Sequence, residues 1–140
     1  MRTTITRWAT ALLSCLLIVI AAIPFCGAAQ QVRDAQAHGA KGKELLARGD
    51  LPAAEQELRR AVAMSPDDAE FLGLLGVALG MQRKLRDSDV YLEKALRLET
   101  ADSVTRRNLA WNQFELGDLS VARTNLARVL KERSAVAISA

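Results

Sequence analysis

Histidine, cysteine and aromatic residues are scarce in this chain. Its 140 residues include one histidine and two cysteines, and aromatic side chains make up 4%. Both cysteines, Cys15 and Cys26, lie in an apolar N-terminal stretch, so the rest of the chain has no thiol for a disulfide, a metal site or a nucleophile. The single histidine, His38, excludes His-rich metal sites and leaves any Ser–His–Asp arrangement dependent on it alone. We expect no catalytic residues, no metal and no cofactor.

An excess of charge of one sign is also missing. Arg2 and Arg7 are the only charged residues in 1–29, which leaves 17 basic and 16 acidic residues in 30–140. A nucleic-acid-binding protein normally gathers a clear positive excess on one face. We therefore expect no nucleic-acid partner.

The composition favours helices. The chain is 50% hydrophobic and 25% charged, and its apolar residues are mainly Ala and Leu rather than the β-branched and aromatic residues of sheets. This length and composition predict one all-α domain with an appendage.

The appendage has the three-part layout of a secretory signal peptide. Residues 1–7 are basic, residues 9–23 are almost wholly apolar, and residues 26–29 are small. This order predicts a signal peptide over 1–29, cleaved before Gln30 or one residue earlier.

An uncleaved signal anchor is the main alternative. Trp8 to Ala29 is a run of 22 uncharged residues, and such a helix spans roughly 30 Å of hydrocarbon. A lipid-bearing Cys15, which follows a partial lipoprotein pattern, is a third possibility. The cleaved and the anchored forms both predict an exported domain, periplasmic or extracytoplasmic, and the anchor places it outside the cytoplasm on the inner membrane. We expect membrane contact only if the N-terminal helix is uncleaved.

The rest of the chain contains an internal repeat of 34 residues. Three columns hold large apolar residues: Leu51, Leu85 and Leu119; Leu58, Leu92 and Leu126; Val62, Leu96 and Leu130. Three others are mostly small: Gly42, Gly76 and Ala110; Ala54, Ser88 and Ala122; Ala61, Ala95 and Val129. Small residues in such columns let paired helices approach closely. A plain helical bundle is the alternative interpretation.

With these columns the chain resembles the tetratricopeptide repeat family. The resemblance implies an α-solenoid of three helical hairpins over 35–68, 69–102 and 103–136. The repeat domain would then occupy 30–136, preceded by the signal or anchor helix and followed by a tail at 137–140.

The repeats also depart from each other. Gly49 and Gly117 suit left-handed helix ends at the turns of repeats 1 and 3, but repeat 2 has Arg83 there. Repeat 1 has His38 and Lys41 where repeat 2 has leucines, so we expect its first helix to begin late or to act as a polar cap.

The resemblance implies a concave groove lined by the first helix of each hairpin, which binds a peptide or helix of another protein. The predicted groove residues are Lys43, Leu74, Val77, Met81, Arg107, Asn108, Trp111 and Phe114. Lys43 and Asn108 match part of the clamp with which some relatives hold a terminal carboxylate, but Gly39, Leu74 and Val104 occupy other clamp positions. In a competing interpretation, Trp111 and Phe114 pack inward and compensate for missing apolar bulk at Arg106.

Three glycines, Gly73, Gly76 and Gly80, lie within one predicted helix. Each costs about 1 kcal/mol of helix stability relative to Ala, so close contact should offset it. We expect tight packing at Gly76 and groove access at Gly73 and Gly80.

The C-terminal residues 134–140 are apolar and too few for the polar capping helix of a solenoid. We expect them to fold over the last hairpin, or the exposed face to contact another chain in weak self-association.

The sequence thus predicts a non-enzymatic scaffold or adaptor that binds another protein, in envelope, pilus or secretion assembly. The alternative is a membrane-tethered accessory subunit of an enzyme or transport complex. An enzyme would need paired carboxylates such as Glu55 with Glu57 or Asp87 with Asp89. The members of each pair are two residues apart, so on a helix they point in different directions, which argues against catalysis.

Overall fold

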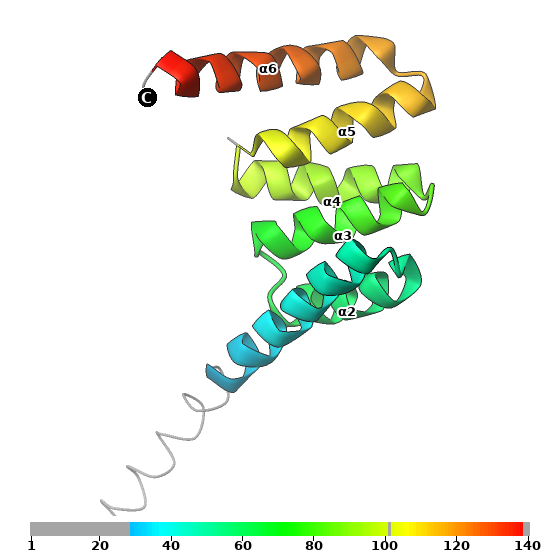
Figure 1. Ribbon diagram of the computed structural model, residues 1–140, viewed down its shortest axis with the longest axis vertical. Coiled ribbons are helices and arrows are strands. Elements are labelled where there is room, and N and C mark those ends of the chain that lie inside the picture. Colours follow the sequence, from blue (N-terminus) through cyan, green and yellow to red (C-terminus); the bar gives the residue numbers. More distant parts are fainter. Residues whose placement is uncertain (1–28, 101, 139–140) are drawn as a thin grey trace, which may run out of the picture. The chain divides into compact units, whose positions relative to one another are not determined.

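A computed structural model describes residues 29–100 and 102–138 of the chain (Figure 1). The chain divides into two compact units, residues 1–34 and 35–140. The predicted signal peptide or anchor, up to residue 28, lies outside the described residues.

The described residues are helical apart from short connections. The helical segments are 29–48, α2 (Leu51–Met64), α3 (Ala69–Met81), α4 (Leu85–Leu98), α5 (Ser103–Leu116) and α6 (Leu119–Ile138). No strand occurs in this part of the chain. The predicted all-α class is confirmed.

Aspartate side chains cap the N-termini of three helices. Asp50, Asp68 and Asp102 each precede a helix, and their side-chain oxygens accept hydrogen bonds from backbone N–H groups of the first turn. Such caps satisfy donors that have no partner within the helix. Helix α4 begins after Lys84, which makes no side-chain cap.

The turn between the two helices of a hairpin requires a left-handed residue. Gly49 and Gly117 adopt φ values of +80° and +89°, as the sequence predicts. In the middle hairpin Arg83 takes this conformation with φ of +64°. A residue with a Cβ is unfavourable there, so the repeat geometry imposes a conformation that arginine does not prefer.

Small residues allow the helices of a hairpin to pack closely. A Cβ atom added to Gly76 would lie 2.6 Å from Leu92, and one added to Gly42 would lie 2.5 Å from Leu58. Both leucines are fully buried. The small-residue column therefore acts as predicted, and a methyl group at Gly76 would displace a core side chain.

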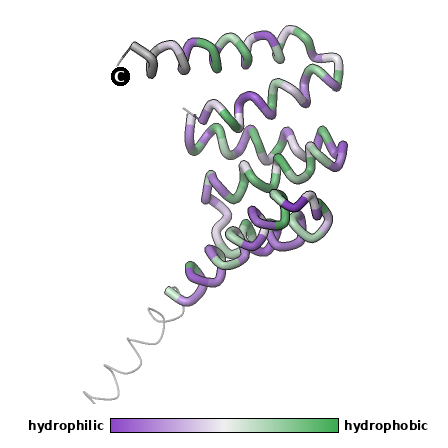
Figure 2. Tube along the Cα trace, in the orientation of Figure 1, coloured by the Kyte–Doolittle hydropathy of each residue, from purple (hydrophilic) through white to green (hydrophobic). Residues whose placement is uncertain are grey.

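Helix α3 lies at the centre of the stacked hairpins. It contacts α2, α4 and α5, and Figure 2 shows it hydrophobic along most of its length. Its buried side chains Leu75, Ala78 and Leu79 form a core cluster with Leu58 of α2. This central position explains why Glu70 is its only charged residue.

The first helix does not begin late, because residues 29–48 are helical. Its polar residues have a buried partner. His38 Nδ1 lies 2.6 Å from Glu57 Oε2, and Lys41 Nζ donates to Glu57 Oε1 at 2.9 Å. Hydrogen bonds from Lys41 and then His38 lower the pKa of Glu57 to about 2. The polar residues that replace leucines thus hold a buried carboxylate.

Helix α6 continues through Ile138, beyond the predicted end at 136. Residues 134–138 extend the helix instead of folding back over the hairpin, since no glycine or proline interrupts 119–138.

The outer face of α6 is exposed. Leu130 is 67% exposed, whereas Leu96 at the same repeat position is 9% exposed and packs against Leu109 of the next helix. Leu119 and Leu126 are exposed as well. Helix α6 therefore presents to solvent the face that α4 buries.

Candidate partner-binding groove

Helices α3 and α5 contact each other directly, although α4 separates them in sequence. A cavity of 320 Å³ lies along their N-terminal halves. It is lined by Ala69, Glu70, Gly73, Leu74, Val77, Glu99, Asp102, Val104 and Thr105.

A second cavity, of 110 Å³, follows towards the C-terminal ends of the same helices. It is lined by Gly76, Val77, Gly80, Met81, Ser88, Asn108, Trp111 and Asn112. Because Val77 lines both cavities, they form one continuous surface, which we call the α3/α5 groove.

Glycines shape this groove from the α3 side. A Cβ atom on Gly73 would lie 3.0 Å from Thr105 Oγ1, and one on Gly80 would lie 3.1 Å from Asn112 Oδ1. Both glycines line a cavity, and both bring α3 close to α5. At both positions the absence of a side chain therefore opens the groove and lets the two helices pack closely.

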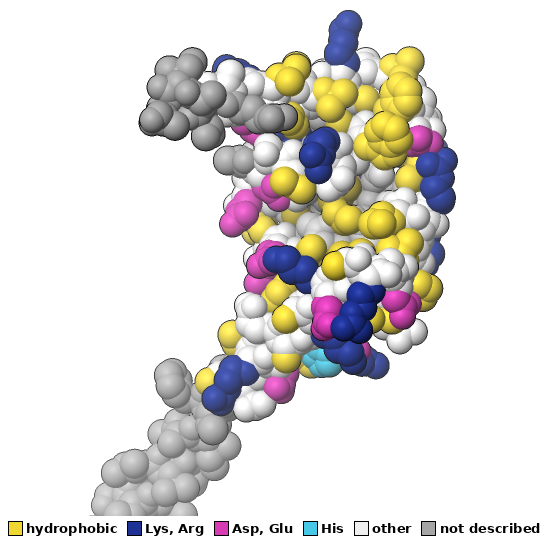
Figure 3. All heavy atoms as spheres, in the orientation of Figure 1, with side chains coloured by type: hydrophobic (Ala, Val, Ile, Leu, Met, Phe, Trp, Pro, Cys, Tyr) yellow, Lys and Arg dark blue, Asp and Glu magenta, His cyan; other side chains and the backbone are white. Residues whose placement is uncertain are grey.

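Two aromatic side chains stand at the C-terminal end of the groove. Trp111 is 60% exposed and Phe114 is 54% exposed, with ring centroids 5.9 Å apart and the planes tilted by 33°. The interpretation in which they pack inward is wrong. Figure 3 shows hydrophobic side chains gathered over α3 and the C-terminal half of α5.

Arg106 explains why these aromatic rings are not needed in the core. It is itself 5% exposed, so its own alkyl chain fills the position where an apolar residue was expected. Its Nη2 donates to the Thr100 carbonyl oxygen and lies 3.3 Å from Glu132 Oε1. Among the described residues, Arg106 Nε and Glu132 Oε2 are buried without a hydrogen-bond partner.

A polar network forms the floor beneath Trp111. Ser88 Oγ donates to the Gly76 carbonyl at 2.6 Å, and Asn112 Nδ2 donates to Ser88 Oγ at 2.7 Å and to Asp89 Oδ1 at 2.9 Å. Burial raises the pKa of Asp89. The network fixes α5 against α3 and α4. Gly76 and Ser88 belong to the small-residue columns, but Asn112 and Asp89 belong to none, so the columns did not predict these hydrogen bonds.

Five of the predicted groove residues line the two cavities. Leu74 and Val77 are half-buried and line the first cavity. Met81 is exposed beside Trp111, and Asn108 is half-buried in the second cavity. The structure brings these side chains together with Trp111.

The two predicted basic residues, Lys43 and Arg107, line neither cavity of the groove. Lys43 Nζ donates to Glu70 Oε1 at 2.9 Å. Arg107 is exposed, lines neither cavity and makes no ion pair with any residue that the structure describes. Sequence reasoning missed the carboxylates of Glu99 and Asp102, which line the first cavity.

The carboxylate pairs considered for catalysis have separate partners. Lys84 Nζ and Gln82 Nε2 bind Glu55, whereas His38 and Lys41 bind Glu57. The contact with Lys84 is the main cause that lowers the pKa of Glu55 to about 2. Each carboxylate is therefore ionised near neutral pH and held by a different set of donors.

Residues 40–93 match the model of the tetratricopeptide repeat family. This segment of the chain is a tetratricopeptide repeat. Among curated proteins no match to the chain is found. Within the described residues, no group of three or more His, Cys, Asp or Glu side chains is placed to hold a metal ion. A membrane-spanning helix is likewise not found among them.

Solved tetratricopeptide domains share the fold. The second such domain of Spaghetti (RPAP3), bound to the HSP90 peptide SRMEEVD, is 19% identical with a TM-score of 0.69, covering 72% of this chain and 94% of that one. The TPR2B domain of yeast Sti1, in a pHsp70 complex, is 17% identical with a TM-score of 0.68, covering 79% and 86%.

A similar segment occurs within an enzyme. The Thermobaculum terrenum O-GlcNAc transferase, a K341M mutant, is 24% identical with a TM-score of 0.70. The match covers 74% of this chain but 20% of the transferase chain. At these identities the likeness concerns the helical repeat fold alone.

Proposed function

We propose that the chain is a non-enzymatic interaction module that binds a peptide or helix of another protein in the α3/α5 groove. The observation that carries this proposal is the exposure of Trp111 and Met81 around a cavity, with the exposed Phe114 ring in contact with Trp111. Exposed aromatic residues beside a pocket are the side chains that dominate protein interfaces when a partner covers them. The solved relatives bound to HSP90 and Hsp70 sequences support the same mode of use for this fold.

The rigid floor of the groove supports this function. The bonds that link Asn112, Ser88 and the Gly76 carbonyl lock α5 against α3 without using any group of Trp111. A preorganised surface loses less conformational entropy when it binds a partner. The groove thus combines exposed apolar anchors with a fixed backbone frame.

We further propose that the module works outside the cytoplasm, in an envelope, pilus or secretion assembly. This rests on the basic, apolar and small-residue order of residues 1–29. Mass spectrometry of the protein from its host should find a mature N-terminus at Gln30. An intact Met1 in the membrane fraction would instead support the alternative, a membrane-tethered accessory subunit of an enzyme or transport complex.

A weak second contact is proposed at the C-terminal hairpin. Leu119, Leu126 and Leu130 are exposed on α6, where the preceding hairpins are covered by a following helix. A second copy that packs on this face would remove these leucines from water.

Photo-crosslinking tests the main proposal. A photoreactive phenylalanine analogue at position 111 should capture a partner in the host cell. The same analogue at position 90, an exposed site on α4 that lines neither cavity, serves as the control. Capture of the same partner from position 90 and not from position 111 would overturn the groove proposal.

A further inference from the structure

The two ends of the α3/α5 groove differ in chemistry. The second cavity, next to Trp111, is lined by no charged residue. The first cavity is lined by three carboxylates, Glu70, Glu99 and Asp102, and by no basic side chain. The groove is therefore uncharged at the end that holds Trp111 and acidic at the other.

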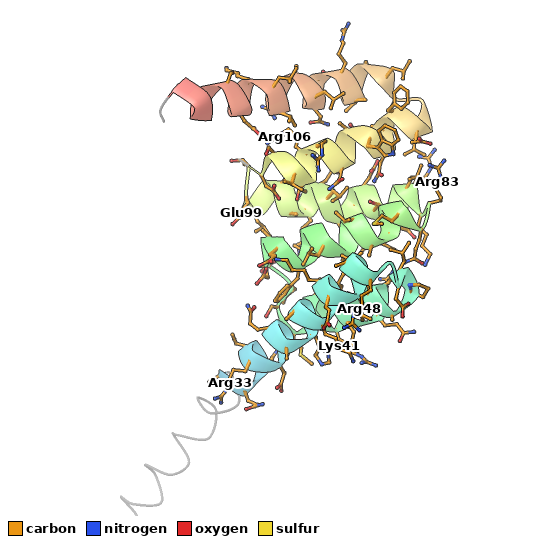
Figure 4. All side chains as sticks on the ribbon, viewed as in Figure 1. Arg33, Lys41, Arg48, Arg83, Glu99 and Arg106 are labelled. Carbon is orange, nitrogen blue, oxygen red and sulfur yellow. The ribbon has the colours of Figure 1, made fainter. Side chains whose placement is uncertain are left out.

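One of the three carboxylates is available to a ligand. Asp102 caps α5, because its oxygens accept hydrogen bonds from the backbone N–H groups of Val104 and Thr105. Glu70 pairs with Lys43. Glu99 is exposed and pairs with no basic side chain among the described residues; Figure 4 shows it at the end of the helices opposite to Arg83.

We propose that the groove selects a partner segment that has both an apolar side chain, bound beside Trp111, and a basic residue that pairs with Glu99. This rests on the proposed function and names the chemistry of its partner. Opposite charges across an interface favour the matching partner and disfavour one of the wrong sign.

The same geometry disfavours an acidic peptide. Lys43, the basic residue that would meet a carboxylate, already pairs with Glu70 at 2.9 Å. A ligand carboxylate near the first cavity would also face Glu99 and Asp102. An acidic sequence such as SRMEEVD, the peptide in the Spaghetti complex, is therefore a poor match.

The length of the groove sets the spacing of the two ligand groups. Val104 lines the acidic cavity and Trp111 the uncharged one, seven residues apart on α5. At 1.5 Å of rise per residue this separation is about 10 Å. An extended segment covers it in about three residues and a helical segment in about seven.

The test is a selection of twelve-residue peptides from a random phage-displayed library on the full chain. A parallel selection on Trp111→Ala removes peptides that bind elsewhere. We expect the Trp111-dependent peptides to be enriched in Lys or Arg near an apolar residue, and SRMEEVD to bind at least tenfold more weakly than they do.

Charge variants locate the contact. Glu99→Gln should weaken binding of a selected basic peptide about threefold at low salt, as expected for one exposed ion pair, and the difference should shrink as salt rises. Glu93→Gln, an exposed carboxylate on α4 that lines neither cavity, is the control and should have no effect.

The possible results separate the two proposals. Trp111-dependent peptides without a basic preference, or with one that Glu99→Gln leaves unchanged, would overturn the inference about charge and leave the proposed groove function standing. A selection that yields no Trp111-dependent peptide would contradict both.

Discussion

The turn of the middle hairpin offers a direct test of how the repeat fold is built. Arg83 has φ of +64°, where the other two hairpins have glycine. A side chain in the left-handed region costs the folded state about 1–2 kcal/mol, and glycine avoids this cost. Glycine also makes the unfolded chain more flexible, which offsets about 0.5–1 kcal/mol of that gain. Arg83→Gly should therefore be more stable than Arg83→Ala by about 1 kcal/mol.

The alanine variant is needed because Arg83 has a second role. Its Nη2 lies 2.8 Å from Glu115 Oε2, and this exposed pair contributes about 0.2–1 kcal/mol. Both substitutions remove it, so their difference isolates the backbone. Gly117→Ala is the converse control, because a Cβ at that position meets no atom within 4 Å and any loss is conformational.

Urea unfolding followed by circular dichroism gives the free energies of unfolding. We expect Arg83→Gly to exceed Arg83→Ala by about 1 kcal/mol and Gly117→Ala to fall below wild type by a similar amount. Equal stability of the glycine and alanine variants at position 83 would refute the reasoning.

Three further predictions concern packing at Gly76, the pH dependence of stability through Glu57, and self-association through α6. Gly76→Ala should destabilise the protein by about 1–2 kcal/mol despite the better helix propensity of alanine, because its Cβ would lie 2.6 Å from Leu92, whereas Gly73→Ala should be close to neutral; thermal unfolding of both variants checks the difference. Because the pKa of Glu57 is lowered to about 2 from 4.5, its ionic contacts stabilise the fold above pH 4.5 and are lost as the pH falls towards 2. The free energy of unfolding of Glu57→Gln should then be about 1–2 kcal/mol below that of wild type at pH 7 and equal to it near pH 2. A difference that stays constant over this pH range in urea unfolding would count against the prediction. Leu130→Lys should abolish any concentration-dependent association in sedimentation velocity without lowering the melting temperature, since Leu130 is exposed, and a wild type that stays monomeric at millimolar concentration would disprove association through α6.

The helical class and the hairpin turns could be predicted because they depend on local signals. Ala and Leu favour helices, and Gly49 and Gly117 have the conformational freedom that a left-handed turn requires. The Gly76 contact with Leu92 was also within reach, since both residues belong to columns that recur with the repeat.

Contacts between unlike residues far apart in sequence could not be predicted. His38 and Lys41 looked like surface residues because nothing local indicates a buried carboxylate at Glu57. The burial of Arg106 depends on Thr100 and Glu132. For the same reason the sequence did not decide whether Trp111 packs into the core or faces solvent, because this depends on whether Arg106 fills its own place in the core.

The acidic end of the groove was missed for a different reason. Glu99 lies in the connection between α4 and α5, and the repeat pattern assigns groove positions to helices only. A loop residue enters the groove through the geometry of the stacked hairpins, which a single sequence does not specify.

The fluorescence of Trp111 tests the central claim most directly. The chain has two tryptophans, so Trp8→Phe leaves Trp111 as the only one. We predict that its emission moves to shorter wavelength when a partner segment binds, because a side chain that is 60% exposed becomes covered. Saturating binding of the partner with unchanged Trp111 emission would contradict the account.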